Sequence, residues 1–277
     1  MRLLPLLVLL LSFTCHGFEP LNTDDAGTVK PGGNQIEQYY FKIRNHHSSS
    51  PITTDFSTPG EEYFGNGTAQ ALPFTYTRGL SDSVEGSVGV SYFIDPRGTY
   101  SPISNKVVAM KWRFAQDPEG KWALAIKPIL TLPSSGQQQA NGIGLAKPNY
   151  GANLIGSKYW DALEVHLNAS YMRSAYDVNY PVGSSYNSNR VNIFFFSAAP
   201  VWTVTKGVRL AIDMGLTTNP PNNQQYLKNY ALVAAILSPL EELDIGLSYM
   251  RSASNMGNAV SKNQGASRYE IGFTWRF

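Results

Sequence analysis

The feature that most constrains the fold is a regular series of strand-length segments joined alternately by tight turns and long polar loops. In one of the clearest segments, Val84, Val88 and Val90 alternate with Glu85 and Ser87. Successive side chains of a strand point to opposite faces, so one face is apolar and the other polar. Almost no helical periodicity follows residue 33. We predict about twelve strands, over residues 34–46, 69–80, 83–95, 104–117, 121–133, 150–160, 162–174, 189–205, 207–219, 228–239, 242–252 and 268–277.

The connections between these segments alternate in length without exception. Tight turns are predicted near residues 81–82, 117–120, 160–161, 206–207 and 239–242. Long loops rich in Ser, Gly, Asn and Pro are predicted at 47–68, 96–103, 134–149, 175–188, 220–227 and 253–267. Bacterial barrels have short periplasmic turns, long external loops and an even number of strands. We therefore predict an all-β fold, a transmembrane antiparallel up-and-down β-barrel of about 12 strands spanning residues 34–277.

The last nine residues form the clearest strand. Tyr269, Ile271, Phe273, Trp275 and Phe277 share one face, and polar or small residues share the other. This segment resembles the C-terminal strand by which bacteria mark outer-membrane barrels for insertion. The resemblance implies that Phe277 is an assembly signal and that the barrel-assembly machinery is a partner.

The N-terminus has the pattern of a secretory signal peptide. A short basic start is followed by an apolar run over residues 3–13 and by small or polar residues up to Gly17. The run is too short to span a bilayer comfortably, and Pro5 interrupts it. Cys15 would leave with this segment (1–17), so we expect a mature chain with no disulfide and no sulfur-ligated metal. Residues 18–33 are expected to be a periplasmic N-terminal segment.

Composition agrees with a barrel and excludes nucleic acid as a partner. Charged residues make up 15% of the chain, the mean hydropathy is −0.21, and the net charge of +2 comes from scattered residues. No later stretch reaches the ~18 consecutive apolar residues of a spanning helix. Lumen-facing polar residues dilute the hydropathy of barrel strands. We expect the outer membrane as the location and its lipid as a partner.

The aromatic residues are predicted to form two girdles, as they do at the two interfaces of a membrane barrel. The predicted external girdle contains Tyr92, Tyr171, Tyr249 and Tyr269. The predicted periplasmic girdle contains Phe114, Trp122, Trp275 and Phe277.

Two features conflict with regular strands. Pro73, Pro128 and Pro200 lie inside predicted strands, where proline cannot donate to the ladder, so bulges or shifted strand limits are expected there. The run 194–196 consists of three phenylalanines and is apolar on both faces. We expect one of its rings to point into the lumen.

The residues before the first strand carry a family resemblance. Segment 20–28 reads PLNTDDAGT, and segment 32–37 reads GGNQIE. These residues resemble the start of the outer-membrane family named for the MetA pathway of phenol degradation, whose members open with Thr-Asp-Asp-x-Gly and start strand one through Gln-x-Glu. The resemblance implies a transporter-like barrel that admits small compounds, aromatic or otherwise hydrophobic.

Asp24 and Asp25 are the only adjacent acids in that segment. They could bind a cation, but Asp before Ala-Gly favours an Asx-type turn, and two carboxylates fall short of a calcium site. We therefore predict a turn, with no metal and no cofactor.

Three classes of function are open: a pore or transporter, a barrel enzyme that hydrolyses lipid or peptide, and a closed structural or adhesin barrel. About twelve strands leave a narrow lumen. A hydrolase needs a nucleophile within reach of an oriented histidine, and the mature chain offers only His46, His47 and His166. His46 and His47 adjoin a serine-rich loop but have no identifiable acid to orient them, and His166 has no serine two residues away. We therefore favour the pore and expect a small-molecule solute as its partner.

The polar faces of the predicted strands carry a belt of alternating charge in the periplasmic half. Glu85 is expected to face Arg113, and Asp244 to face Arg276, across neighbouring strands. Rings of charged side chains set selectivity in other channels. The predicted lumen-lining constriction therefore consists of Glu85, Lys111, Arg113, Glu164, His166, Arg209, Asp213, Asp244 and Arg276.

Overall fold

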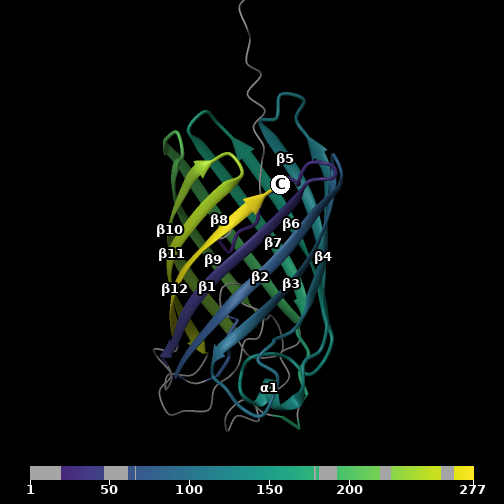
Figure 1. Ribbon diagram of the computed structural model, residues 1–277, viewed down its shortest axis with the longest axis vertical. Helices are drawn as coiled ribbons and strands as arrows, with labels where there is room; N and C mark the ends of the chain where they lie inside the picture. The colour runs from purple at the N-terminus through teal and green to yellow at the C-terminus, as the bar shows by residue number, and fades with distance from the viewer. Residues whose placement is uncertain are drawn as a thin grey trace, which may run out of the picture.

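The structure is a closed barrel of twelve antiparallel strands in which each strand pairs with its neighbours in sequence and β12 pairs with β1 (Figure 1). The computed structural model describes residues 20–46, 62–65, 67–177, 179–180, 192–218, 226–256 and 265–277. The expected signal peptide, His47 and parts of several long loops lie outside these residues. The strands are β1 (Asn34–His46), β2 (Gly67–Ser81), β3 (Val84–Asp95), β4 (Val107–Gln116), β5 (Trp122–Thr131), β6 (Asn149–Tyr159), β7 (Leu163–Arg173), β8 (Asn192–Thr205), β9 (Val208–Thr218), β10 (Tyr226–Leu240), β11 (Leu243–Met256) and β12 (Gly265–Arg276).

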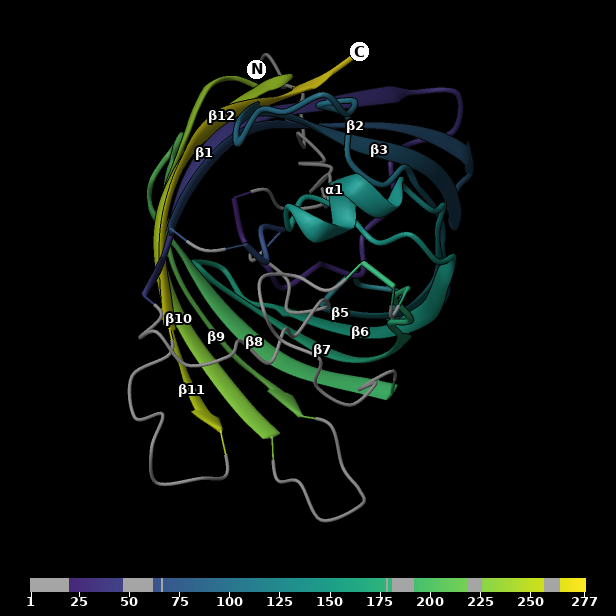
Figure 2. The ribbon, with the colours of Figure 1, turned by 90° about the horizontal axis from the view of Figure 1, so that it is seen from below.

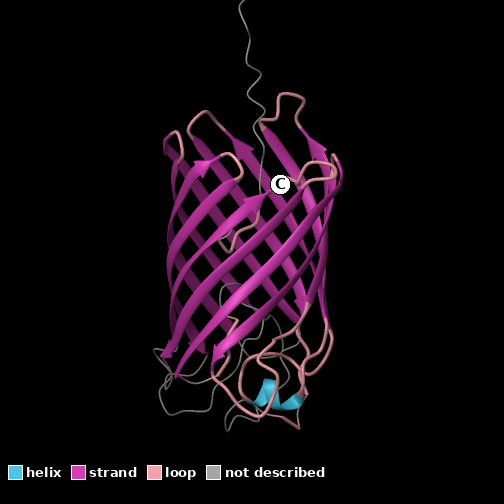
Figure 3. Cartoon of the chain, in the orientation of Figure 1, coloured by secondary structure: helices cyan, strands magenta, loops and turns pink. Residues whose placement is uncertain are grey.

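The predicted order of short and long connections is confirmed. The five short turns lie at one end of the barrel, together with the start of β1 and the end of β12 (Figure 3). We call this the turn end, and the opposite end, where the long connections lie, the loop end. Within the described ranges, no helix is long and apolar enough to cross a membrane.

Alternation along strands such as β7, β9 and β11 places polar side chains inside and apolar side chains outside, whereas β1 and β10 also turn apolar side chains such as Phe41 and Leu232 inward. Leu167 and Leu247 on the outer surface are 55% and 54% exposed, whereas Asp213 and Glu270 inside are 0% and 1% exposed. The predicted girdle residues share the outward face, and the rings of Tyr249 and Tyr269 lie 4.7 Å apart. Such an inverted distribution suits a barrel with an apolar environment outside and a polar interior.

The expected bulges at the three prolines are absent. The register is kept across Pro73, Pro128 and Pro200 on both sides of each strand. The register shifts of these strand pairs lie elsewhere, at Gln70/Ala71, Gly79/Ser81, Arg113/Ala115 and Thr203/Thr205. Pairing is interrupted beside each proline toward one neighbouring strand only, because the missing N–H removes a bond from one ladder and leaves the other intact. The expectation for the phenylalanine run is met: Phe195 points inward and stacks on Tyr230, with ring centroids 6.0 Å apart.

Phe277 closes the seam of the barrel. The Asn34 N–H donates to the Phe277 carbonyl at 2.8 Å, and the Phe277 N–H donates back to the Asn34 carbonyl at 3.0 Å. The Phe277 ring also lies 4.7 Å from that of Trp275 on the outer surface.

We therefore predict that deletion of Phe277 lowers the amount of assembled, heat-modifiable protein several-fold, because it removes both the closing contacts and the terminal aromatic. The measurement is the folded fraction on semi-native gels of outer-membrane preparations. Phe277→Tyr, which keeps the ring and the backbone bonds, is the matched control. Normal assembly of the truncated chain would contradict this role.

The β5–β6 connection folds across the loop end and carries the short helix α1 (Gly136–Ala140) (Figure 2). Gln138 Nε2 donates to the carbonyls of Ser101 and Ile103 at 2.8 and 2.5 Å. Gln139 Nε2 donates to the carbonyls of Asp177 and Tyr180 at 2.7 Å each. These bonds fasten the connection to loops on both sides, so it forms a cover over part of the barrel mouth.

Candidate functional site

The N-terminal segment lies inside the barrel. The sequence predicts a periplasmic N-terminal segment over residues 18–33, and the structure places residues 20–30 of it, which we call the plug, within the lumen. Leu21 packs against Phe195, Leu232 and Met250, and Ala26 is fully buried in the lumen. The segment is short and rich in backbone and side-chain polar groups, which pair with the inward polar faces of the strands.

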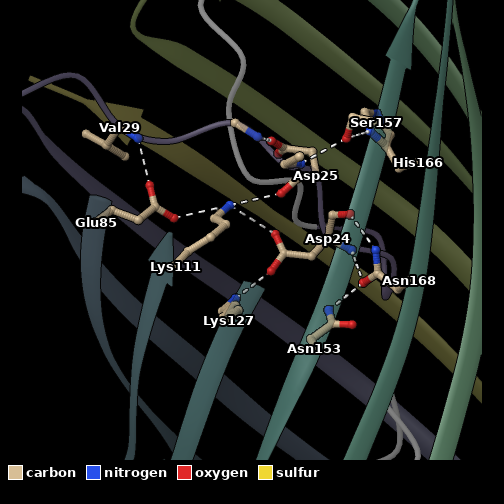
Figure 4. Close-up of polar contacts among 12 residues, drawn as sticks. Asp24, Asp25, Val29, Glu85, Lys111, Lys127, Asn153, Ser157, His166 and Asn168 are labelled. Carbon is tan, nitrogen blue, oxygen red and sulfur yellow. Dashed lines mark hydrogen bonds and ion pairs between the residues drawn. The ribbon is translucent and has the colours of Figure 1, made fainter. Parts of the chain in front are cut away.

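Asp24 lies between two lysines of the barrel wall (Figure 4). Its carboxylate is 2.6 Å from Lys127 Nζ and 3.3 Å from Lys111 Nζ. Lys111 also lies 3.2 Å from Glu85 and donates to the Asp25 carbonyl at 3.1 Å. Burial disfavours the carboxylate, but the two lysines outweigh it and hold the pKa of Asp24 well below its ordinary value.

Asp25 forms the predicted turn. Its side chain accepts a hydrogen bond from the Gly27 N–H, two residues on. The other carboxylate oxygen, Oδ2, is buried without a hydrogen-bond partner among the described residues. Burial raises the pKa of Asp25, and Lys111 offsets only part of this effect. The prediction of a turn is thus confirmed for Asp25, whereas Asp24 serves as an ionic anchor.

Asp213 holds the first residues of the plug. The backbone N–H groups of Asn22 and Thr23 donate to its Oδ2 at 2.6 and 2.9 Å, and the Thr23 hydroxyl donates to its Oδ1 at 2.6 Å. Tyr230 adds a fourth donor at 2.6 Å. The Thr23 hydroxyl also lies 2.7 Å from that of Ser197. A buried carboxylate with four donors is a strong and specific anchor.

β6 and β7 bind the middle of the plug. Asn168 accepts from the Asp24 N–H at 2.9 Å and donates to the Asp24 carbonyl at 2.7 Å. The Ala26 N–H donates to Ser157 Oγ at 2.9 Å. Ser157 Oγ in turn lies 2.8 Å from His166 Nδ1, and His166 Nε2 lies 3.4 Å from Glu164. Side chains of the two strands thus form hydrogen bonds with the plug backbone.

Glycine is required where the plug leaves the lumen at the turn end. The Val29 N–H donates to Glu85 at 2.7 Å, and the Gly32 N–H donates to the Gly79 carbonyl at 2.9 Å. A Cβ atom at Gly79 would lie only 2.1 Å from the carbonyl oxygen of Lys30. Only a residue without a side chain allows this close approach.

A cavity of about 260 Å³ remains in the lumen beside the plug. Leu21, Asn22 and Asp24 of the plug form part of its wall. The apolar part of the barrel wall is formed by Ile129, Ala152, Met172, Ile193 and Phe195. The polar part is formed by Gln35, Glu37, Thr75, Thr77, Glu85, Ser87, Lys111, Lys127, Asn153 and Ser170.

The structure places the nine predicted lumen residues on the inward faces of their strands. Asp244 contacts Arg276 at 2.7 Å and Arg209 at 3.0 Å, so that part of the charge belt is present. The expected pairing of Glu85 with Arg113 is wrong. Arg113 lies closer to the turn end and donates to the carbonyl of Asp82, and Lys111 takes the place beside Glu85.

Several site residues were missed by sequence reasoning. The sequence pattern does not point to Lys127 as part of the site, and it does not connect Ser157 with His166. The signal that could have found Ser157 is the register of β6 against β7, which sets Ser157 opposite His166. That register cannot be read from either strand alone.

Comparison with known proteins identifies the fold. No protein-family model matches the chain, and no curated protein matches it. The COG4313 outer membrane channel from Pseudomonas putida F1 has a TM-score of 0.61 and 14% identity, covering 90% of this chain and 97% of that one. The NanC porin has a TM-score of 0.56 and 11% identity, covering 86% and 98%. The fold is that of an outer-membrane channel barrel.

A third structure is similar at the same level. The KdgM porin, solved in complex with disordered oligogalacturonate, has a TM-score of 0.50 and 9% identity, covering 88% of this chain and 99% of its own. At these identities the likenesses show the fold alone.

Proposed function

We propose that this chain is a plugged outer-membrane transporter for small compounds, aromatic or hydrophobic ones among them. The observation that carries the proposal is the cavity beside the plug, which joins an apolar wall to a polar one inside a barrel with the fold of outer-membrane channels. Ligand pockets commonly combine apolar walls with a few placed polar groups. The motif at residues 20–28 supports membership in the family named for the MetA pathway of phenol degradation.

The outer membrane is the proposed location. The outward faces carry exposed aliphatic residues such as Leu167, Leu210 and Val233, which would contact lipid acyl chains. The turn end, which holds both ends of the barrel domain, would face the periplasm. We further propose that the charged belt around Asp244, Arg209 and Arg276 forms the selective constriction toward that side.

Passage through the lumen requires the plug to move. Apart from the apolar packing of Leu21 and Ala26, its contacts are polar and ionic. They reach at least five strands, β3, β4, β5, β7 and β9, through Glu85, Lys111, Lys127, Asn168 and Asp213. Such contacts can be exchanged for water when the segment is released, at a smaller cost than exposing an apolar core. The proposed transport step is therefore release of residues 20–30 from the barrel wall.

The test is a reversible lock between plug and wall. Thr23 and Ser197 have hydroxyl oxygens 2.7 Å apart, so the double variant T23C/S197C is expected to form a disulfide between them. We expect the oxidised double variant to lose uptake of small aromatic compounds by cells, and reductant to restore it. The single variant T23C, present in the same amount, should be insensitive to reductant. Unchanged uptake by the locked protein would contradict transport through the lumen.

A hydrolase is the second candidate, because Ser157, His166 and Glu164 provide the three kinds of group that a hydrolytic triad needs. The geometry favours a structural role. Ser157 is 4% exposed, and its Oγ accepts the Ala26 N–H of the plug. A nucleophile must reach its substrate, whereas this serine is covered by the chain itself. The uptake measured with the locked variant separates the two candidates, because a hydrolase gives no uptake that depends on whether the disulfide is oxidised or reduced.

A further inference from the structure

One carboxylate of the cavity has no cation of its own. The ionisable residues of the cavity wall are three acids, Asp24, Glu37 and Glu85, and two bases, Lys111 and Lys127. Lys127 is bonded to Asp24 at 2.6 Å, and Lys111 lies between Asp24 and Glu85 at 3.3 and 3.2 Å. If all five groups are charged, the wall has a net charge of −1, and Glu37 is the acid left over.

The surroundings of Glu37 do not compensate it. Its partners across the two ladders are Thr75 on β2 and Thr274 on β12, both neutral. Among the described residues, no ion pair or hydrogen bond is made by its side chain. The two lysines of the cavity wall, Lys111 and Lys127, are already held by Asp24 and Glu85. Glu37 is half-buried, and an acid in such a place without a partner costs free energy, which a bound cation would reduce.

The opposite part of the cavity suits an apolar group. Ile129, Met172, Ile193 and Phe195 lie on β5, β7 and β8, across the lumen from Glu37 on β1. Phe195 is fixed by its stacking on Tyr230, whose ring plane is 10° from its own. The volume of about 260 Å³ is just below the ~300–1,000 Å³ of pockets for drug-sized ligands. A ligand of that volume is a small one.

We propose that this cavity is a binding site for a small organic amine with an apolar, preferably aromatic, body. The ammonium group would pair with the Glu37 carboxylate, and the body would pack against Met172, Ile193 and Phe195. An organic anion would add a further negative charge beside Asp24, Glu37 and Glu85, since both lysines are already paired. This inference rests on the proposed transport function and names its substrate class.

The test is calorimetric titration of the purified full-length barrel with three probes that share one body: 2-phenylethylamine, 2-phenylethanol and phenylacetate. We expect the amine to bind at least about tenfold more tightly than the alcohol, as a charge-assisted hydrogen bond would give, and phenylacetate to bind most weakly. Glu37→Gln should remove the advantage of the amine and leave the affinity for the alcohol unchanged. Glu37→Asp, which keeps the charge, should retain part of the advantage of the amine over the alcohol.

The matched control is Glu119→Gln, which makes the same charge change at an exposed turn, where Glu119 pairs with Lys121. It should bind the amine as the wild type does. Equal binding of amine and alcohol, or an unchanged preference in Glu37→Gln, would overturn the amine site. If Glu37→Gln does not fold as a heat-modifiable barrel, Glu37→Asp is measured in its place. A Glu37→Asp variant that binds amine and alcohol equally would then count against the proposal. The uptake assay with the locked plug is independent of these outcomes, so failure of the amine site and failure of the transport function are distinguishable.

Discussion

Replacing Asp24 with Asn is expected to release the plug. The change removes the negative charge that pairs with Lys111 and Lys127 and leaves the geometry of the backbone contacts intact. Breaking a buried ion pair is strongly destabilising, but the side chains of Asp24 and Lys127 are 16% and 28% exposed. We therefore expect the free energy of plug seating to fall by about 1–3 kcal/mol, which raises the ratio of released to seated plug roughly 5- to 150-fold.

The measurement is the rate at which a cysteine at position 26 reacts with a water-soluble maleimide. Ala26 is fully buried when the plug is seated, and the mature chain is expected to contain no other cysteine. The labelling rate should rise with the released fraction. Asp25→Asn is the matched control, because Asp25 makes no ion pair within 4 Å among the described residues and its Oδ2 has no hydrogen-bond partner there. Equal acceleration by both variants would contradict the role assigned to Asp24.

The same anchor predicts how pH acts on the plug. The pKa of Asp24 is lowered in the seated state, so its contribution is fully present above its ordinary pKa of 3.8 and is lost as the pH falls through the lowered value. Burial raises the pKa of Asp25, so ionisation of Asp25 opposes seating as the pH rises. The released fraction of the wild-type plug should therefore increase below about pH 4, and Asp24→Asn should remove that increase. Because only the thiolate reacts, the labelling rate at each pH is divided by that of the unfolded chain at the same pH.

Replacing Asp213 with Ala is expected to free the start of the plug. The plug would lose three hydrogen bonds to one buried carboxylate, from the Asn22 N–H, the Thr23 N–H and the Thr23 hydroxyl. Hydrogen bonds to charged groups are the stronger ones, so we expect a total loss of about 2–4 kcal/mol in the free energy of seating. The labelling assay at position 26 applies here as well.

Two comparisons make the Asp213 result specific. Asp213→Asn keeps one carbonyl oxygen as an acceptor, so its labelling rate should lie between those of the wild type and Asp213→Ala. Among the described residues, Tyr230 is the one donor to Asp213 that comes from the barrel and not from the plug, and Tyr230→Phe removes it. It should change labelling much less than Asp213→Ala. A labelling rate for Asp213→Ala equal to that of the wild type would exclude this carboxylate as an anchor.

The strands could be predicted from the sequence, and the plug could not. Alternation in a strand such as Leu163–Arg173 repeats every two residues, and a one-residue error in register would turn the whole apolar face inward. The limits of that strand, and which of its side chains point inward or outward, are therefore strongly specified. The C-terminal strand is specified in the same way by its five apolar positions.

Residues 20–30 have no such period. The contact of Asp24 with Lys127 joins positions 103 residues apart, and that of Thr23 with Asp213 joins positions 190 residues apart. Nothing in the local sequence distinguishes an acid that faces water from one that meets a lysine across a lumen. The prolines were misjudged for a related reason, because a strand in a barrel has two ladders and Pro128 interrupts only the one toward β4.

The central claim is that the lumen is a passage and that residues 20–30 close it. The most direct measurement is the current through single barrels in a planar lipid bilayer, for the wild type and for a chain lacking residues 20–28. We expect little or only brief current from the wild type and discrete, sustained currents from the shortened chain. A shortened chain that folds as a heat-modifiable barrel yet conducts no more than the wild type would contradict the account.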